Sequence, residues 1–512
     1  MKKPPEHYGQ ILPAFRRQSE QLPPRHKSRF KETYMPIKST NNTSALRLTV
    51  LEHIASAFWE GRLEESVDKI SFRMRPRTGN ATRCCIYKDR AVIRERIIGA
   101  LGFRLEEERD ESVPLKEYAE RALAREKPTW PILTVCDIAC HGCLKARYFV
   151  SDACQACVAR SCQGACRFNA ISFAHERSYI DADNCRNCGL CKDACPYQAI
   201  VHLNVPCEAA CPVQAIHKGK DGRAIIDFDK CTSCGRCMRA CPFGAIIERR
   251  EVLEVLRAIR DGAHVTALMA PAIVGQYEGG PGRIAAALRE LGFSDVIEVA
   301  EGADMTSRHE ADEFVERMER GDKFMTTSCC PAYVEAVRRH APELLPYVSA
   351  TPTPMHYATG IARERHPETV TVFIGPCVAK RQEGLRDDLV DFVLTFEEVG
   401  ALFSAKGINV AECEEAPLGT ASGEGRGYAV SGGVAAAVKK LVGDRFEVKP
   451  LYINGLSLKG IRQLQQYAAG DCPGNLVEVM TCEGGCVGGA GVMAPARKAA
   501  RAVENFSKKG KV

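Results

Sequence analysis

The feature that most constrains the fold of this chain is a dense run of cysteines in its first half. Seventeen of the 26 cysteines lie between Cys136 and Cys241. The first residues, MKKPPEHYGQILPAFRR, lack the apolar run of a secretory signal, and no segment offers 18 consecutive apolar residues for a membrane span. We therefore expect a cytoplasmic chain whose thiols stay reduced and bind metal rather than form disulfides.

A repeated pattern organises this run. The sequence C-x3-C-x3-A-I occurs four times, ending at Ile171, Ile200, Ile216 and Ile246. Two copies read C-x2-C-x2-C-x3-C-P in full: Cys185, Cys188, Cys191 and Cys195, then Cys231, Cys234, Cys237 and Cys241. This spacing is that of bacterial ferredoxins, whereas zinc sites pair two separated C-x2-C knuckles. The apolar stretches SYIDAD and AIIDFD precede these copies, so we predict an α+β ferredoxin-like domain over 136–250 with [4Fe–4S] clusters.

The fourth cysteine of one run serves the other cluster in two-cluster ferredoxins, which predicts how these thiols pair. One cluster would take Cys185, Cys188, Cys191 and Cys241, and its partner would take Cys231, Cys234, Cys237 and Cys195. The two irregular copies would add a cluster from Cys154, Cys157, Cys162 and Cys211, and one from Cys140, Cys143, Cys166 and Cys207. We thus expect two clusters from the complete copies and four in total, with Cys136 left over.

The region ahead of the cysteine run has a different composition. The 512 residues suffice for two to four domains, and a net charge of +6 gives no strong nucleic-acid or membrane signal. We expect 1–135 to be an extended arm over the first 45 residues followed by a small, mainly helical region, with helices from Leu46, over 91–101 and through LKEYAERALAREK. Cys84 and Cys85 could form a metal or redox site, but a pair of small buried hydrophobes is the preferred interpretation.

Residues 251–512 alternate short apolar runs with helix-like segments such as Glu310–Arg320. Candidate strands lie at 265–270, 295–300, 369–375, 390–395 and 475–482. This pattern is typical of parallel sheets buried on both faces, and it predicts one large α/β unit or two α/β lobes. Ligands bind beyond the carboxyl ends of such strands, where five cysteines fall: Cys329, Cys330, Cys377, Cys482 and Cys486. We interpret Cys413 and Cys472 as scattered thiols without a role.

Three segments around these cysteines resemble the signature motifs of the [FeFe]-hydrogenases. They are TSCCPA (327–332), PCVAKRQE (376–383) and EVMTCEGGCVGGAG (478–491), in the family's order. The ferredoxin-like block ahead of them is also a family feature, and CCIYKDRAVIRER and CHGC resemble the subgroup called group B. The resemblance implies two lobes with parallel sheets and an H-cluster between them.

The resemblance also implies roles for individual residues. Cys330, Cys377, Cys482 and Cys486 would hold the [4Fe–4S] part of the H-cluster, and Cys486 would bridge to a diiron site that carries CO, cyanide and an azadithiolate. Lys380 would bind a cyanide, while Ala270, Pro271 and Met480 would line the pocket. Cys329 would pass protons to the azadithiolate, supplied along a path of Glu383, Glu310, Glu313, Arg317 and Thr353, the last replacing a serine. Two departures are Gly375, where the family usually has methionine, and Ala272, where it often has serine.

The function that follows is reversible formation of H₂ from protons and electrons. Electrons would enter through the accessory clusters from a ferredoxin or another redox subunit, since no G-x-G-x-x-G dinucleotide motif is present. Arg186, Lys192, Arg236 and Arg239 could steer an acidic ferredoxin, or they could be ordinary surface charges. The H-cluster would need a maturation machinery. The alternatives are a low-turnover hydrogen sensor, a non-catalytic protein of iron–sulfur assembly, and an electron-transfer subunit with a vestigial C-terminal domain.

Overall fold

The structure is a computed structural model that describes residues 41–108, 110–140, 143, 147–387 and 390–510. Residues 1–40 of the expected N-terminal arm lie outside the described residues. Among the described residues, no helix is long and apolar enough to cross a membrane.

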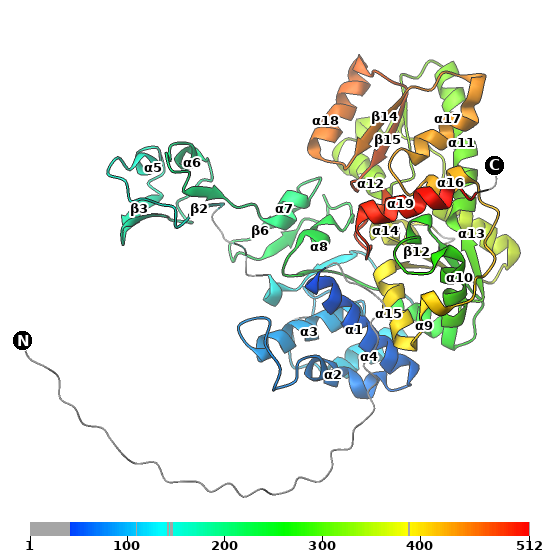
Figure 1. The fold of residues 1–512 in the computed structure, drawn as a ribbon, viewed down its shortest axis with the longest axis horizontal. Helices are drawn as coiled ribbons and strands as arrows, with labels where there is room; N and C mark the ends of the chain where they lie inside the picture. The colour runs from blue at the N-terminus through cyan, green and yellow to red at the C-terminus, as the bar shows by residue number, and fades with distance from the viewer. Residues whose placement is uncertain (1–40, 109, 141–142, 144–146, 388–389, 511–512) are drawn as a thin grey trace, which may run out of the picture. The chain divides into compact units, whose positions relative to one another are not determined.

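Four helices form the first group of elements (Figure 1). They are α1 (Asn42–Trp59), α2 (Leu63–Met74), α3 (Ile86–Ala100) and α4 (Leu115–Ala124). The side chain of Asn41 caps α1 by accepting hydrogen bonds from the backbone N–H groups of Thr43 and Ser44. The helices expected from the apolar periodicity are therefore present. α1 packs against α15 (Phe396–Lys406), so this group shares a hydrophobic core with the C-terminal half of the chain.

The expectation that Cys84 and Cys85 are buried is wrong. Both thiols are exposed, and their Sγ atoms lie 3.9 Å apart just before α3. Cys85 is the N-cap of this helix, where its Sγ accepts a hydrogen bond from the Lys88 N–H at 3.4 Å. A capping side chain must stay at the open end of a helix to reach its unpaired N–H groups, which keeps this thiol out of the core.

The cysteine-rich region contains short antiparallel pairs with single-turn helices between them. The strands are β1 (Leu133–Val135), β2 (Tyr148–Val150), β3 (Ile171–Ala174), β4 (Arg177–Ile180), β5 (Ile200–His202), β6 (Ile216–Lys218), β7 (Ala224–Ile226) and β8 (Ile246–Glu248). The short helices are α5 (Ser161–Gly164), α6 (Leu190–Asp193), α7 (Pro206–Ala210) and α8 (Arg236–Ala240). Each repeat of the sequence ends where a strand begins, because its buried isoleucine is the first residue of β3, β5, β6 or β8.

The strand pairing divides this region into two ferredoxin-like units. In the first unit, β2 pairs with β5 and β3 pairs with β4. In the second, β1 pairs with β8 and β6 pairs with β7. Figure 1 shows α5 and α6 together in one unit and α7 and α8 in the other. Each unit therefore combines two repeats that are neighbours in the sequence.

The C-terminal half forms two α/β lobes with parallel sheets, as expected. A four-stranded sheet has the order β10-β9-β12-β13 and a three-stranded sheet the order β11-β15-β14. The strands are β9 (Val265–Met269), β10 (Asp295–Glu298), β11 (Met325–Thr326), β12 (Val370–Gly375), β13 (Phe392–Thr395), β14 (Pro450–Asn454) and β15 (Leu476–Met480). All five expected strands are present. The sequence patterns missed β11, which has two residues, and β14, whose residues are mostly half-exposed.

Helices cover these sheets and connect the lobes. They are α9 (Val252–Arg260), α10 (Gly280–Leu291), α11 (Val299–Glu319), α12 (Pro331–His340), α13 (Pro354–Arg365), α14 (Ala379–Gly384), α16 (Gly423–Gly427), α17 (Gly433–Val442), α18 (Leu458–Gln466) and α19 (Ala496–Ser507). The long helix α11 contacts α13, which packs on the four-stranded sheet, and α17, which packs beside β15. It therefore contacts elements of both lobes.

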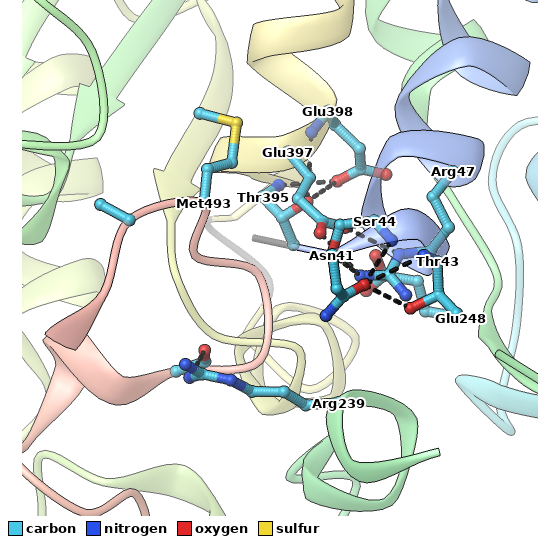
Figure 2. A network of polar contacts seen from close by, with 12 residues as sticks. Asn41, Thr43, Ser44, Arg47, Arg239, Glu248, Thr395, Glu397, Glu398 and Met493 are labelled. Atoms are coloured by element: carbon cyan, nitrogen blue, oxygen red, sulfur yellow. Dashed lines mark hydrogen bonds and ion pairs between the residues drawn. The ribbon is translucent and has the colours of Figure 1, made fainter. Parts of the chain in front are cut away.

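A buried ionic network joins the three regions of the chain. Arg381 of α14 binds Glu248 of β8 at 2.7 Å and also binds Glu398 of α15, and all three side chains are fully buried. Arg47 of α1 binds Glu397 at 2.7 Å, and Figure 2 shows this pair near Glu248 and Glu398. Burial lowers the pKa of Arg381, but the carboxylates of Glu398 and Glu248 more than offset it, so the pKa is raised and the guanidinium stays charged.

Candidate functional site

A buried cavity lies where strands from both parallel sheets end. Its walls include the residues that follow β9, β11, β12 and β15. Five thiols line it: Cys329, Cys330, Cys377, Cys482 and Cys486. These thiols, which follow separate strands in the sequence, therefore line one cavity, because the carboxyl ends of the strands face a common space.

Four of these thiols form a mutually repelling set. Burial, followed by the neighbouring charge of Cys330, raises the pKa of Cys377 and of Cys486 to about 12. Burial also raises the pKa of Cys482, with Cys377 and Cys330 as the next causes. Ionising such a cluster in an apolar pocket is unfavourable without compensating positive charge, and iron bound to the thiolates supplies that charge. The donor set therefore fits a large iron–sulfur group.

Lys380 of α14 lines the same cavity, and two neighbouring side chains hold its ammonium in place. Its ammonium donates hydrogen bonds to Thr353 Oγ1 at 3.0 Å and to Glu383 Oε2 at 2.8 Å. The Thr353 hydroxyl in turn donates to Glu383. Burial lowers the pKa of Lys380, but Glu383 together with the thiols of Cys377 and Cys329 more than offsets this effect, so the pKa is raised and the ammonium stays charged. The expected cavity residues Ala270, Pro271 and Met480 are also in place, as is Ala272.

A chain of polar groups leads from Cys329 toward the surface of α11. Glu310 is fully buried, and its Oε1 accepts a hydrogen bond from the Ser328 N–H at 3.1 Å. Burial raises the pKa of Glu310 to about 8. Glu313, one turn along α11, accepts a hydrogen bond from Ser349 Oγ at 2.6 Å and pairs with Arg317 at 2.7 Å. The structure thus brings together Cys329 and the three expected α11 residues.

The hydroxyl on this path is Ser349 rather than Thr353. Ser349 Oγ donates a hydrogen bond to Glu313, and the Ser349 hydroxyl also lowers the pKa of Glu310, whose Oε2 is buried without a hydrogen-bond partner among the described residues. Ser349 is therefore a neighbour of both carboxyls. Thr353 is engaged with Glu383 and Lys380. Sequence reasoning missed Ser349 because three hydroxyl residues occur within 349–353. Only the fold shows that Ser349 and Thr351 bind Glu313 of α11, whereas Thr353 binds Glu383. Glu383 likewise holds Lys380 and has no described contact with the Glu310–Glu313 path.

The accessory thiols also gather in groups, but the members of these groups differ from those expected. Cys166 lines one small cavity with Cys185, Cys188 and Cys191, and Cys211 lines another with Cys231, Cys234 and Cys237. Cys241 instead lies beside Cys207, Cys140 and Cys143, whose charges interact. In the first unit, Cys162 and Cys154 both contact Ser178 and share a small hydrophobic cluster with Cys195.

The predicted pairing of the cysteines is therefore wrong. It exchanged the fourth cysteines between the two complete copies, whereas the structure exchanges them within each ferredoxin-like unit. The reason is the strand pairing, which joins the first copy to the second and the third copy to the fourth. Among the described residues, no three His, Cys, Asp or Glu side chains are close enough to share a single metal ion; the thiols surround open space instead.

The second ferredoxin-like unit contacts the domain that contains the cavity. A Cβ added to Gly235, next to Cys234, would come within 2.7 Å of Ala490 Cβ and 3.2 Å of Val378. The charge of Cys234 is also among those that raise the pKa of Cys482, after burial and the charges of Cys377 and Cys330. The thiols of this unit and those of the cavity are therefore neighbours.

Arg236 and Arg239 hold this contact together rather than face a partner. Arg236 donates to the carbonyl oxygen of Leu456 at 2.8 Å, and Arg239 donates to those of Gly488 and Gly489 at 2.7 and 3.0 Å. Arg239 is seen beside this loop in Figure 2. The expectation that Arg236 and Arg239 either steer a partner or are ordinary surface charges is therefore wrong. Arg186 and Lys192 are exposed.

Comparisons with known proteins agree with this geometry. Residues 263–490 match the family model of the iron-only hydrogenase large subunit, C-terminal domain, and residues 178–201 and 224–247 match the 4Fe-4S binding domain. The chain is 29% identical over 300 residues to the periplasmic [Fe] hydrogenase large subunit of Nitratidesulfovibrio vulgaris, which covers 47% of this chain and 71% of that one.

Two further relatives have different described functions. Iron hydrogenase 1 of Clostridium pasteurianum is 30% identical over 260 residues, or 41% of this chain and 45% of that protein, so the match spans less than half of its length. The cytosolic Fe-S cluster assembly factor narfl of Xenopus tropicalis is 25% identical over 267 residues, or 41% of this chain and 56% of that one. The cavity with its convergent thiols and the matching family model show that residues 263–490 form an [FeFe]-hydrogenase-like domain, with ferredoxin-like iron–sulfur units ahead of it.

Proposed function

We propose that this protein is an [FeFe]-hydrogenase that interconverts H₂ with two protons and two electrons. The observation that supports this most directly is the cavity, in which a fifth thiol, Cys329, accompanies four thiols suited to a cluster and the ammonium of Lys380. A protein that only stores or transfers a cluster needs the four ligands but has no evident use for the fifth thiol beside a buried carboxyl.

The residues present would hold an H-cluster as follows. Cys330, Cys377, Cys482 and Cys486 would bind its [4Fe–4S] part, and Cys486 would also bridge to the diiron site with its CO, cyanide and azadithiolate ligands. Soft thiolates suit both roles. When bound, this group supplies the electron-transfer and bond-forming chemistry of the reaction. Maturation proteins would have to deliver the diiron part.

Lys380 would orient and stabilise the cofactor by electrostatics. Its ammonium is charged and buried, and Glu383 and Thr353 fix its position at the cavity wall. A charge-assisted hydrogen bond from this ammonium to a cyanide would be stronger in the buried, apolar cavity than in water. Ala270, Pro271 and Met480 would exclude water from the remaining walls.

Protons would travel between solvent and Cys329 through the polar chain on α11. Arg317 and Glu313 lie nearest the surface, Ser349 connects Glu313 to Glu310, and Glu310 faces Cys329. With a pKa of about 8, Glu310 is mostly protonated at neutral pH and can give or regain its proton there. The Cys329 thiol, at the cavity wall, would complete the transfer.

Electrons would reach the cavity through four accessory [4Fe–4S] clusters. We propose the ligand sets Cys154, Cys157, Cys162, Cys195; Cys166, Cys185, Cys188, Cys191; Cys140, Cys143, Cys207, Cys241; and Cys211, Cys231, Cys234, Cys237. The last set would be the immediate donor, because Cys234 neighbours Cys482. A ferredoxin or another redox subunit would supply the electrons, with Arg186 and Lys192 available to attract an acidic partner. We place the protein in the cytoplasm, where thiols stay reduced.

A second candidate function is iron–sulfur cluster assembly, because the Xenopus relative carries that description. The two functions differ in what the cavity must hold. An assembly factor needs the cube thiols and a route for handing on clusters, whereas a hydrogenase also needs the diiron site and a proton supply. The Cys329 thiol at the cavity wall and the polar side chains of Glu310, Ser349 and Glu313 favour the hydrogenase.

Anaerobic loading with a synthetic diiron complex tests the proposal. The full chain, with its iron–sulfur clusters rebuilt, is incubated with the complex and supplied with reduced ferredoxin, while H₂ is measured by gas chromatography. A hydrogenase takes up the complex, shows its infrared CO and cyanide bands and evolves H₂. Uptake of four-iron clusters with neither bands nor H₂ would favour the assembly function instead.

A further inference from the structure

An aromatic ring occupies the space above Gly375, at the end of β12. A Cβ added to Gly375 would come within 2.2 Å of Phe373 Cε1 and 2.6 Å of Phe373 Cζ. Carbon atoms that are not bonded do not approach so closely. Phe373 and Gly375 are two residues apart on one strand, so their side-chain positions point to the same face of the sheet. The ring therefore fills the place where any side chain at residue 375 would begin.

Space, and not backbone conformation, is what requires a glycine here. Gly375 is paired in register with Thr395 of the neighbouring strand β13. Its φ is outside the left-handed region that favours glycine. A residue with a side chain could adopt this backbone, and it is excluded only by the ring of Phe373. The two residues are thus complementary in size.

The ring also forms part of the cavity wall. Phe373 is 4% exposed and lines the cavity with Cys329, Cys377 and Lys380. The Lys380 Nζ lies 5.9 Å from the centroid of the Phe373 ring. An ammonium at this distance is attracted by the negative face of a ring, and the attraction grows when both groups are shielded from water. Phe373 therefore contacts the one cation that would face the cofactor.

We propose that Phe373 is a positioning residue for the cofactor site, and that its ring replaces the side chain that is missing at residue 375. The inference rests on the proposed function and extends it. The ring would wall the cavity on the side of Lys380 and restrict where the ammonium can lie. It also accounts for the departure of Gly375 from the methionine of related motifs: a larger residue at 375 is compatible with this fold only if residue 373 is smaller.

Thermal unfolding of the full chain without the diiron complex tests the size complementarity. Gly375→Met should lower the melting temperature by about 5 °C or more, because an overpacked core is destabilised by strain. Phe373→Ala should also lower it, because of the cavity left behind. The double variant Phe373→Ala, Gly375→Met should melt well above the value expected from adding the two losses. The size complementarity would be overturned if the double variant lost the sum of the two single losses in melting temperature, or if Gly375→Met melted like the wild type.

Infrared spectra of the loaded protein test the positioning role separately. Phe373→Leu should keep the fold and shift the cyanide bands of the bound diiron complex, because Lys380 would lose its aromatic neighbour. Gly384→Ala is the matched control, since a Cβ there meets Val390 and Val393 at an ordinary 3.4 Å, and its bands should equal those of the wild type. Unshifted bands in Phe373→Leu would overturn the positioning role. A wild type without any bands would overturn the proposed function itself, while the melting cycle would still decide the packing pair.

Discussion

At the scale of single residues, burial determines the chemistry of the site more than residue type does. Glu310, Glu313 and Glu316 lie within two turns of α11, yet only Glu310 is fully buried with a pKa raised to about 8. The sequence motifs identified Cys329, Lys380 and the cube thiols, because their spacing to strand ends is local. They could not distinguish Ser349 from Thr353, because that choice depends on how the loop before α13 turns toward α11.

Replacing the titratable carboxyl of Glu310 should affect both H₂ evolution and the pH dependence of stability. Glu310→Gln should reduce H₂ evolution by about 100-fold or more, as for other lost proton carriers. The folded protein holds a proton on Glu310 that the unfolded chain loses above pH 4.5, so stability contributed by this group falls as pH rises from about 4.5 to about 8. The melting temperature of Glu310→Gln relative to the wild type should therefore increase across this range. Glu316→Gln, exposed on the same helix, is the control, and equal pH profiles for both variants would contradict the assignment.

Two hydroxyl variants separate the proton path from the support of Lys380. Ser349→Ala should slow H₂ evolution by about 10-fold or more, because it removes the hydroxyl beside Glu310 and Glu313. It should leave the infrared bands of the loaded cofactor unchanged, because the Ser349 hydroxyl bonds to Glu313 and to the Thr351 N–H and not to Lys380. Thr353→Ala should shift the cyanide bands, because the Lys380 ammonium loses its bond to Thr353 Oγ1 at 3.0 Å. If Thr353→Ala slowed H₂ evolution without shifting the bands, and Ser349→Ala shifted the bands instead, Thr353 would be the hydroxyl on the proton path.

At the scale of elements, the repeat predicts the ferredoxin units but not how they pair. Each isoleucine of the repeat begins a strand, and the strands SYIDAD and AIIDFD lie where the apolar runs indicated. All four copies, however, share the same C-x3-C-x3-A-I spacing around the fourth cysteine, so nothing local shows which copy exchanges that cysteine with which. The decision is made by the contacts between strands such as β2 and β5, which are about 50 residues apart in the chain.

Iron counting in the full chain tests the corrected pairing. Cys166→Ser and Cys188→Ser should remove the same cluster, so the double variant should lose no more iron than either single one, roughly four atoms. Cys188→Ser combined with Cys241→Ser should lose roughly eight, because these thiols belong to different clusters. EPR of the reduced proteins gives an independent count. A loss of only four irons in the Cys188–Cys241 double variant would support the pairing between the complete copies instead.

At the scale of the whole molecule, the N-terminal helices and the second ferredoxin-like unit contact the domain that holds the cavity. Arg381 comes directly after Lys380 and binds carboxylates from β8 and α15, and Arg47 adds a contact from α1. Composition gave no indication of these contacts, since they join residues up to 350 positions apart. The fold class and the convergence of the thiols could be predicted from local motifs, but contacts between the regions could not.

Breaking this network should destabilise the whole chain. Arg381→Met removes the closer of the two buried cations that pair with Glu248 and Glu398, and it leaves only Arg250 at 3.2 and 3.5 Å from these carboxylates. The loss should cost about 3 kcal/mol and lower the first thermal transition. Arg445→Met is a matched control, because its ion pair with Asp312 is largely exposed, and such pairs contribute little. If both variants melt at the same temperature, the buried network does not connect the regions as described.

The most direct test of the central claim is H₂ evolution by the fully loaded protein with and without the Cys329 thiol. The wild type should evolve H₂ from reduced ferredoxin, and Cys329→Ala should lose about 100-fold to 10,000-fold of that rate while keeping its iron content and infrared bands. Cys413→Ala removes a thiol far from the cavity walls and should match the wild type. A loaded wild type that evolves no H₂ would contradict the hydrogenase assignment, and a fully active Cys329→Ala would contradict the proton route through Cys329.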